Sequence, residues 1–127
     1  MNTDNFYDHP NVIYLETSVN TEYKSKFINT TDAMLHARKM GETFGLAVAE
    51  FSTKNKPIIT SSSKKDNEHL KILGNKAIKY NSKNELLKIF NNIKSIINSL
   101  NDWNAYKNYT PEKVMENFDK LVFSNIC

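Results

Sequence analysis

Short runs of apolar residues alternate along the chain with segments in which apolar residues recur at helical spacing. The runs predict four strands, at residues 11–15, 33–37, 57–60 and 77–80. Helical spacing predicts helices over about 21–29, 44–54 and 68–73, the last ended by Gly74, which suits a left-handed cap. Because strands and helices alternate, the expected fold class is α/β, with a parallel sheet of about four strands and flanking helices.

The C-terminal third has the strongest helical pattern. Ser82 and Glu85 have the spacing of a capping box, and the apolar residues that follow predict one helix from Ser82 to about Leu100. Thr110 and Pro111 resemble an N-cap followed by proline at the first helical position, so a last helix is expected after them. We expect residues 1–100 to form one domain, with residues 101–127 forming a connection and a C-terminal helix packed on it.

Composition narrows the class of protein. The chain has 127 residues, of which 39% are hydrophobic, enough for a compact core. Its lysines are scattered and its net charge is only +3, so nucleic acid is not an expected partner. There is no apolar run that would span a membrane, no signal peptide, and only one cysteine, Cys127. The expected location is therefore the cytoplasm.

The segment Gly41–Phe51 carries the main candidate chemistry, because it lies where a strand is expected to lead into a helix. In an open parallel sheet, ligands bind at this carboxyl edge. Glu50 has apolar neighbours throughout this segment, and burying an unpaired carboxylate would cost several kcal/mol. A ribose diol would be a suitable partner, since a carboxylate can accept both hydroxyl protons. A glutamate at the core edge, bonded to backbone amides, is the alternative.

Glu42 lies in the turn just before this helix, about two helical turns from Glu50. That separation suits a sugar and a ribose at opposite ends of a diphosphate. The diphosphate would lie on the backbone N–H groups at the start of the helix, which belong to Thr43, Phe44, Gly45 and Leu46. An acidic residue at a helix N-terminus is also stabilised by the helix dipole, so Glu42 has a structural explanation too.

The remaining candidates are two histidines and the two basic residues that follow the first of them. His36 lies in a predicted strand that ends near the site, where it would either donate to the diphosphate or sugar or bond to a neighbouring side chain. Arg38 and Lys39 follow it and would add positive charge. His69 has no second ligand at useful spacing, so no metal site is expected.

The segment resembles the retaining glycosyltransferases of the GT-B fold, whose signature is two glutamates with seven residues between them. Glu42 and Glu50 have this spacing within Glu-Thr-Phe-Gly-Leu-Ala-Val-Ala-Glu. Flanking segments also fit the family, among them residues 31–38 and 55–60, and the resemblance extends over roughly residues 10–100. It implies a Rossmann-like sheet that forms part of the C-terminal, nucleotide-sugar-binding half of such an enzyme.

The resemblance implies a donor substrate, a nucleoside-diphosphate sugar linked to UDP or GDP, and no cofactor or metal. Glu50 would bind the ribose hydroxyls, and Glu42, the catalytic candidate, would face the sugar hydroxyls near the 3-position. The acceptor domain and the basic pair of the family have no counterpart here, so we expect a truncated enzyme or one that needs a complementary acceptor-domain protein. The alternative is a non-catalytic interaction module with a degenerate glycosyltransferase fold, for which a homodimer is one expected form.

Overall fold

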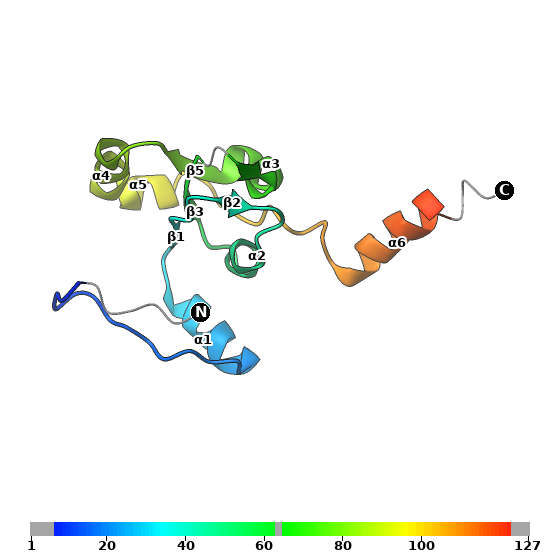
Figure 1. Ribbon diagram of the computed structural model, residues 1–127, viewed down its shortest axis with the longest axis horizontal. Coiled ribbons are helices and arrows are strands. Elements are labelled where there is room, and N and C mark those ends of the chain that lie inside the picture. The colour runs from blue at the N-terminus through cyan, green and yellow to red at the C-terminus, as the bar shows by residue number, and fades with distance from the viewer. Residues whose placement is uncertain (1–6, 63–64, 123–127) are drawn as a thin grey trace. The chain divides into compact units, whose positions relative to one another are not determined.

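Residues 7–62 and 65–122 are described by a computed structural model, which confirms an α/β architecture (Figure 1). The chain divides into two compact units, Met1–Thr30 and Thr31–Cys127. Every described strand belongs to the second unit. Cys127 lies outside the described residues.

The first unit contains helix α1 (Thr21–Thr30), and Asn20 precedes it and accepts a hydrogen bond from the Tyr23 amide at 2.8 Å. The predicted strand at residues 11–15 is wrong. This segment contains a turn, in which the Val12 amide bonds to the His9 carbonyl, followed by irregular backbone. Its Ile13 side chain is 80% exposed. Among residues 7–62 and 65–122, no strand pairs with this short apolar run, and pairing is needed for a strand inside a parallel sheet.

Three strands of the second unit form a parallel sheet in the order β1-β3-β5: β1 (Met34–His36), β3 (Ile58–Ser61) and β5 (Ala77–Tyr80). They match the other three predicted strands, so the sheet has three described strands where about four were expected. β3 lies between its neighbours and is the most buried strand, with Ile58, Ile59 and Thr60 at most 2% exposed. This explains its continuous apolar run.

A second, two-stranded parallel sheet was not predicted. It pairs β2 (Gly41–Glu42) with β4 (Asp66–Asn67), placing Glu42 opposite Asn67. Helix α2 (Leu46–Thr53) packs against β1 and β3, and helix α3 (Glu68–Leu73) packs against β2 and β4 (Figure 1). A short 3₁₀ helix, η1 (Gly74–Lys76), then leads into β5. The small sheet thereby fixes the segment that contains Glu42 next to the start of two helices.

Helix α2 begins two residues later than predicted. Gly45 precedes it with φ 79° and ψ 69°, a left-handed conformation that cannot continue as an α-helix. The first intrahelical bond is that from the Ala49 amide to the Gly45 carbonyl. After α3, Gly74 has a positive φ of 55°, and the helix ends there as predicted, although its ψ of −125° is not that of a left-handed helix.

The long helix predicted from Ser82 to Leu100 is interrupted. The structure has α4 (Lys83–Asn91) and α5 (Ile93–Ile97), separated at Asn92. The Asn92 side-chain amide donates to the Lys88 carbonyl at 2.9 Å, and such local bonds compete with helical ones. The predicted cap is confirmed, because the Ser82 hydroxyl accepts a bond from the Glu85 amide. Helix α6 (Pro111–Val122) starts at proline as expected and contains no buried residue.

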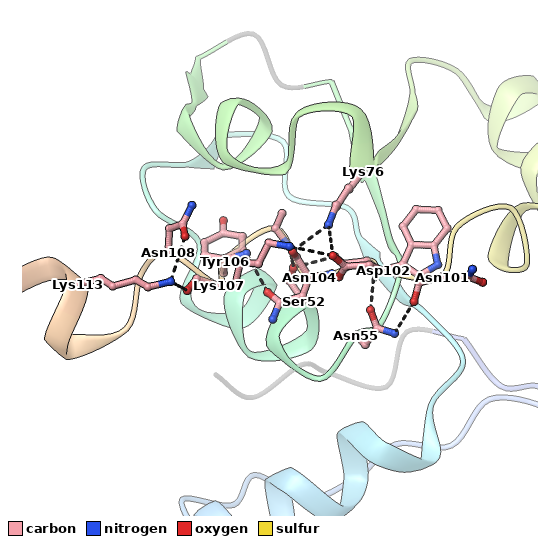
Figure 2. A network of polar contacts seen from close by, with 12 residues as sticks. Ser52, Asn55, Lys76, Asn101, Asp102, Asn104, Tyr106, Lys107, Asn108 and Lys113 are labelled. Carbon is pink, nitrogen blue, oxygen red and sulfur yellow. Dashed lines mark hydrogen bonds and ion pairs between the residues drawn. The ribbon is translucent and has the colours of Figure 1, made fainter.

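Residues 101–109, which we call the strap, connect α5 to α6 and complete the core (Figure 2). Trp103 and Tyr106 are 5% and 2% exposed, and Tyr106 packs in one cluster with Val48, Ile58 and Leu73. The fully buried Ser52 hydroxyl donates to the Trp103 carbonyl at 3.1 Å and accepts from the Ala105 amide at 2.9 Å. A segment expected only as a connection thus provides two of the most buried aromatic side chains.

Asn55 and Lys76 tie the strap to the rest of the unit (Figure 2). The Asn55 side chain accepts from the Trp103 amide at 2.6 Å and donates to the Asn101 carbonyl at 3.2 Å. Its φ of 59° lies in the left-handed region, which asparagine adopts more readily than most residues. Lys76 lies 3.0 Å from Asp102, whose pKa the Lys107 and Lys76 ammonium groups hold well below its usual range.

Candidate functional site

The carboxyl ends of β1 and β3 bring two polar side chains together in the core. His36 is the last residue of β1 and Thr60 is its register partner in β3. The Nδ1 atom of His36 lies 3.0 Å from the Thr60 hydroxyl oxygen, and the two residues are 7% and 0% exposed. Parallel pairing therefore explains directly why a histidine and a threonine that are 24 positions apart meet at this edge.

Glu42 joins this pair from β2. Its Oε1 atom accepts a hydrogen bond from Arg38 at 2.7 Å and lies 3.5 Å from His36 Nε2. The second distance is within ion-pair range but too long for a well-formed hydrogen bond, and the buried Nε2 atom has no hydrogen-bond partner among the described residues. The Glu42 side chain is 21% exposed, so one carboxylate connects the buried cluster to the surface.

His69 closes the cluster from α3. It is fully buried, with Nε2 3.3 Å from the Thr60 hydroxyl oxygen and Nδ1 3.4 Å from the backbone carbonyl of Glu42. Its ring packs edge-on against that of His36 with centroids 5.1 Å apart. A Cβ atom on Gly45 would lie 3.3 Å from the His69 Cβ, so glycine at position 45 lets α2 start close to α3.

Two ionisation equilibria in the cluster are perturbed. Partial burial raises the pKa of Glu42, but the hydrogen bond and charge of Arg38, with smaller contributions from His36, outweigh it and hold the pKa below 4.5. Burial lowers the pKa of His69 below 6.5, and the bond to the Glu42 carbonyl offsets this only in part. The cluster therefore favours an ionised glutamate and a neutral His69.

The expected burial of Glu50 is wrong. Glu50 is exposed, because α2 buries only Val48 and Ser52, one stripe of side chains facing the sheet. Leu46, at the start of the helix, is 74% exposed. Apolar neighbours around the whole helix therefore did not lead to burial of the whole helix, and the exposed Glu50 has no burial cost that a ligand would have to offset.

The predicted row of backbone amides is also corrected. Of the four residues expected to present them, Leu46 alone lies in α2, while Thr43, Phe44 and Gly45 precede the helix in irregular backbone. Gly45 is buried, whereas Thr43 is exposed. The N-terminal amides of the helix therefore start at Leu46.

Phe44 occupies a fixed position beside the strap. The Tyr106 hydroxyl donates to the Phe44 carbonyl at 2.7 Å, and the rings of Tyr106 and Tyr109 both pack edge-on against the Phe44 ring. Burial raises the pKa of Tyr106 to about 12. A cavity of about 550 Å³ adjoins Phe44 and is also lined by Asn108, Tyr109, Val114 and Asn117. Its volume is in the range of small-molecule sites.

Sequence reasoning placed His36, Arg38 and Glu42 near one edge, and the structure brings all three together. It missed Thr60 and His69. The register of two parallel strands was a usable signal for Thr60, since the carboxyl ends of predicted strands 33–37 and 57–60 must meet. No sequence signal placed His69, because α3 is positioned by the two-residue strands β2 and β4, which are too short to predict.

Comparison with protein families, with curated proteins and with solved structures finds no match to this chain. Among the described residues, no group of three or more histidine, cysteine or acidic side chains is arranged to hold a metal ion. No helix within residues 7–62 or 65–122 combines the length and apolar character needed to cross a membrane. The geometry of the site is therefore the main basis for assigning a function.

Proposed function

We propose that the unit Thr31–Cys127 binds a nucleoside-diphosphate sugar, as the donor-binding part of a retaining glycosyltransferase with a Rossmann-like, GT-B type of fold. One observation carries this proposal: an ionised, partly exposed glutamate, Glu42, lies at the carboxyl edge of a parallel sheet and is separated from helix α2 by residues 43–45 only. Edges of this kind are where open α/β sheets bind ligands. The spacing of Glu42 and Glu50 within the glycosyltransferase-like segment supports the same function.

The contacts of Glu42 favour a ligand that donates hydrogen bonds. Arg38 and His36 both approach Oε1, and in the proposed complex a ligand hydroxyl donates to Oε2, the other acceptor oxygen of the carboxylate. A phosphate group would be repelled by the carboxylate, so the diphosphate belongs nearer the N-terminus of α2 and the exposed Arg38. In this arrangement Glu42 faces the sugar, and the exposed Glu50 accepts the ribose hydroxyls. The donor is held without a metal ion.

Calorimetric titration of the full chain tests the proposal. UDP, GDP, UDP-glucose and GDP-mannose are titrated up to millimolar concentration, and binding of at least one nucleotide is expected. A hydrogen bond to a charged group contributes about 1.5–3 kcal/mol, so losing it weakens binding about 10- to 100-fold. Glu50→Gln should weaken the binding of nucleotides and of nucleotide sugars alike. Glu42→Gln should weaken the binding of the nucleotide sugars only.

The matched control is Glu116→Gln, which makes the same change on the exposed surface of α6 and should leave every affinity unchanged. Absence of binding by all four nucleotides, with the chain folded, would contradict the proposal. Binding that neither Glu42→Gln nor Glu50→Gln weakens would show that nucleotides bind elsewhere on the chain, and it would also contradict the proposal.

A second candidate function is a non-catalytic interaction module, and α6 is the observation that favours it. Its apolar residues Val114, Met115, Phe118 and Leu121 are between 48% and 70% exposed. Exposed apolar stripes commonly bind other proteins, a second copy or an acceptor-domain protein in this case. Sedimentation of the chain at increasing concentration distinguishes the two forms. Self-association that Met115→Lys abolishes supports a homodimer, while a monomer at every concentration excludes it.

A further inference from the structure

The cavity beside Phe44 is bounded by the strap and by the first two turns of α6. Its volume is about 550 Å³, and its described lining consists of Phe44, Asn108, Tyr109, Val114 and Asn117. None of these five side chains is charged. An ion that entered the cavity would lose water without meeting a counterion in this lining, which is costly. The cavity therefore favours a neutral ligand.

Two aromatic rings form one corner of the cavity. The Tyr106 hydroxyl holds the Phe44 carbonyl at 2.7 Å, and the Tyr109 amide donates to the Tyr106 carbonyl at 3.0 Å. The rings of Phe44 and Tyr109 lie with their centroids 5.3 Å apart and their planes inclined at 65°. A flat ligand cannot lie parallel to both planes at once. A puckered ring with C–H groups pointing to several sides can contact both.

Lys113 fixes the wall that α6 contributes. Its ammonium group donates to the Lys107 carbonyl at 3.0 Å and to Asn108 Oδ1 at 3.2 Å (Figure 2). These two bonds tie the first turn of α6 to the strap. Because a lysine only donates, the Asn108 atom that faces it is the oxygen, and the amide nitrogen remains to donate to a ligand.

Asn108 and Asn117 supply the polar part of the lining. A side-chain amide both donates and accepts hydrogen bonds, as a hydroxyl group does. A wholly apolar ligand would displace water from the two amides without replacing its hydrogen bonds, which is unfavourable. The cavity therefore suits a ligand with apolar C–H groups on one side and hydroxyl groups on the other.

We propose that this cavity is a binding site for a neutral saccharide. The C–H groups of its pyranose ring pack into the corner formed by Phe44 and Tyr109, and its hydroxyl groups bond to the amides of Asn108 and Asn117. This set of contacts shares no side chain with those proposed for the nucleotide sugar. The inference therefore does not depend on nucleotide binding.

Titration of the full, ¹⁵N-labelled chain with methyl β-glucoside, methyl α-mannoside and cellobiose, followed by NMR, tests the proposal. At least one saccharide is expected to bind at millimolar concentration and to shift the side-chain amide signals of Asn108 and Asn117. The variants Asn108→Ala and Asn117→Ala assign these two signals. Inorganic phosphate and uridine, a charged probe and a flat probe, should leave both signals in place.

Four variants test the contacts. Tyr109→Ala removes one side of the corner and should weaken saccharide binding about 10-fold, whereas Tyr109→Phe keeps the ring and should bind like the wild type. Asn117→Ala should weaken binding about 3- to 10-fold, and because Asn117 is exposed on α6, its replacement leaves the core intact. The matched control is Asn91→Ala, the same change on the exposed end of α4, which should leave the affinity unchanged.

Three results would overturn the proposal. The first is that none of the three saccharides shifts the signals of Asn108 and Asn117 in the folded chain. The second is that uridine or phosphate shifts both signals as strongly as the saccharides do. The third is a saccharide affinity that neither Tyr109→Ala nor Asn117→Ala weakens. Nucleotide binding is measured separately by calorimetry, so either proposal can fail while the other stands.

Discussion

Replacement of Ser52 by alanine tests whether the strap is held by one buried hydroxyl group. The Ser52 side chain is fully buried and makes two bonds, to the Trp103 carbonyl and from the Ala105 amide. Alanine keeps the backbone of α2 and removes only the oxygen. It leaves two backbone groups of the strap without their partner, in a place that water does not reach easily.

The expected loss of stability follows from these two bonds. An unsatisfied buried donor or acceptor costs about 1–3 kcal/mol, so Ser52→Ala should lower the free energy of unfolding by about 2–4 kcal/mol. This is a large part of the roughly 5–15 kcal/mol that stabilises a typical domain. Urea unfolding followed by the fluorescence of Trp103, the one tryptophan of the chain, reports on the unit that contains the strap.

The neighbouring Thr53→Ala is the matched control, since Thr53 is exposed and its hydroxyl bonds only within α2, to the Glu50 carbonyl. It should change stability by less than about 0.5 kcal/mol. If both variants lost the same free energy, or if Ser52→Ala lost less than about 0.5 kcal/mol, the strap would not depend on this hydroxyl and the reasoning would be refuted.

Three further predictions concern single residues. Asn55→Gly keeps the positive φ but removes both side-chain bonds to the strap, so it should lower the free energy of unfolding in urea by about 1–3 kcal/mol. Asn55→Ala should lower it by about 1 kcal/mol more, because alanine is strained in the left-handed backbone conformation. The phenol of Tyr106 has its pKa raised from 10.0 to about 12, so stability should fall as pH rises from 10 to 12, and Tyr106→Phe should lose that dependence. The pKa of His69 is lowered from 6.5, so as pH falls through 6.5 the unfolded chain binds a proton before the folded chain does, and the stability of the folded chain should decline. In His69→Phe, the urea midpoint should therefore depend less on pH than in the wild type between about pH 7.5 and 5.5.

The sequence predicted well those elements whose apolar pattern matches what they bury. β3 is an example, because Ile58 and Ile59 are covered on both faces and appear as an apolar run. The capping residues Ser82 and Thr110 were also predictable, since their hydroxyl groups satisfy amides within the same few residues. Local chemistry and continuous burial are visible in a single sequence.

The predictions that were wrong or missing concern features for which the local sequence gives no signal. Ile13 belongs to an apolar run but stays exposed, and no strand in the described part of the chain pairs with it. Glu50 lies among apolar neighbours on a helix that buries only one stripe, and the cluster around His69 depends on pairing between strands of two residues each. These outcomes are decided by contacts between distant segments, which composition and spacing do not encode.

Closure of the core by Tyr106 has a consequence for how the polypeptide acquires its structure during synthesis. Val48, Ile58 and Leu73 are translated well before the aromatic ring that completes their cluster. A nascent chain that has reached only α4 therefore still exposes the apolar surface that Tyr106 will cover, together with the unsatisfied hydroxyl of Ser52. Incomplete chains with exposed apolar surface are prone to aggregate, so this interval during translation is the one in which a chaperone would be most useful.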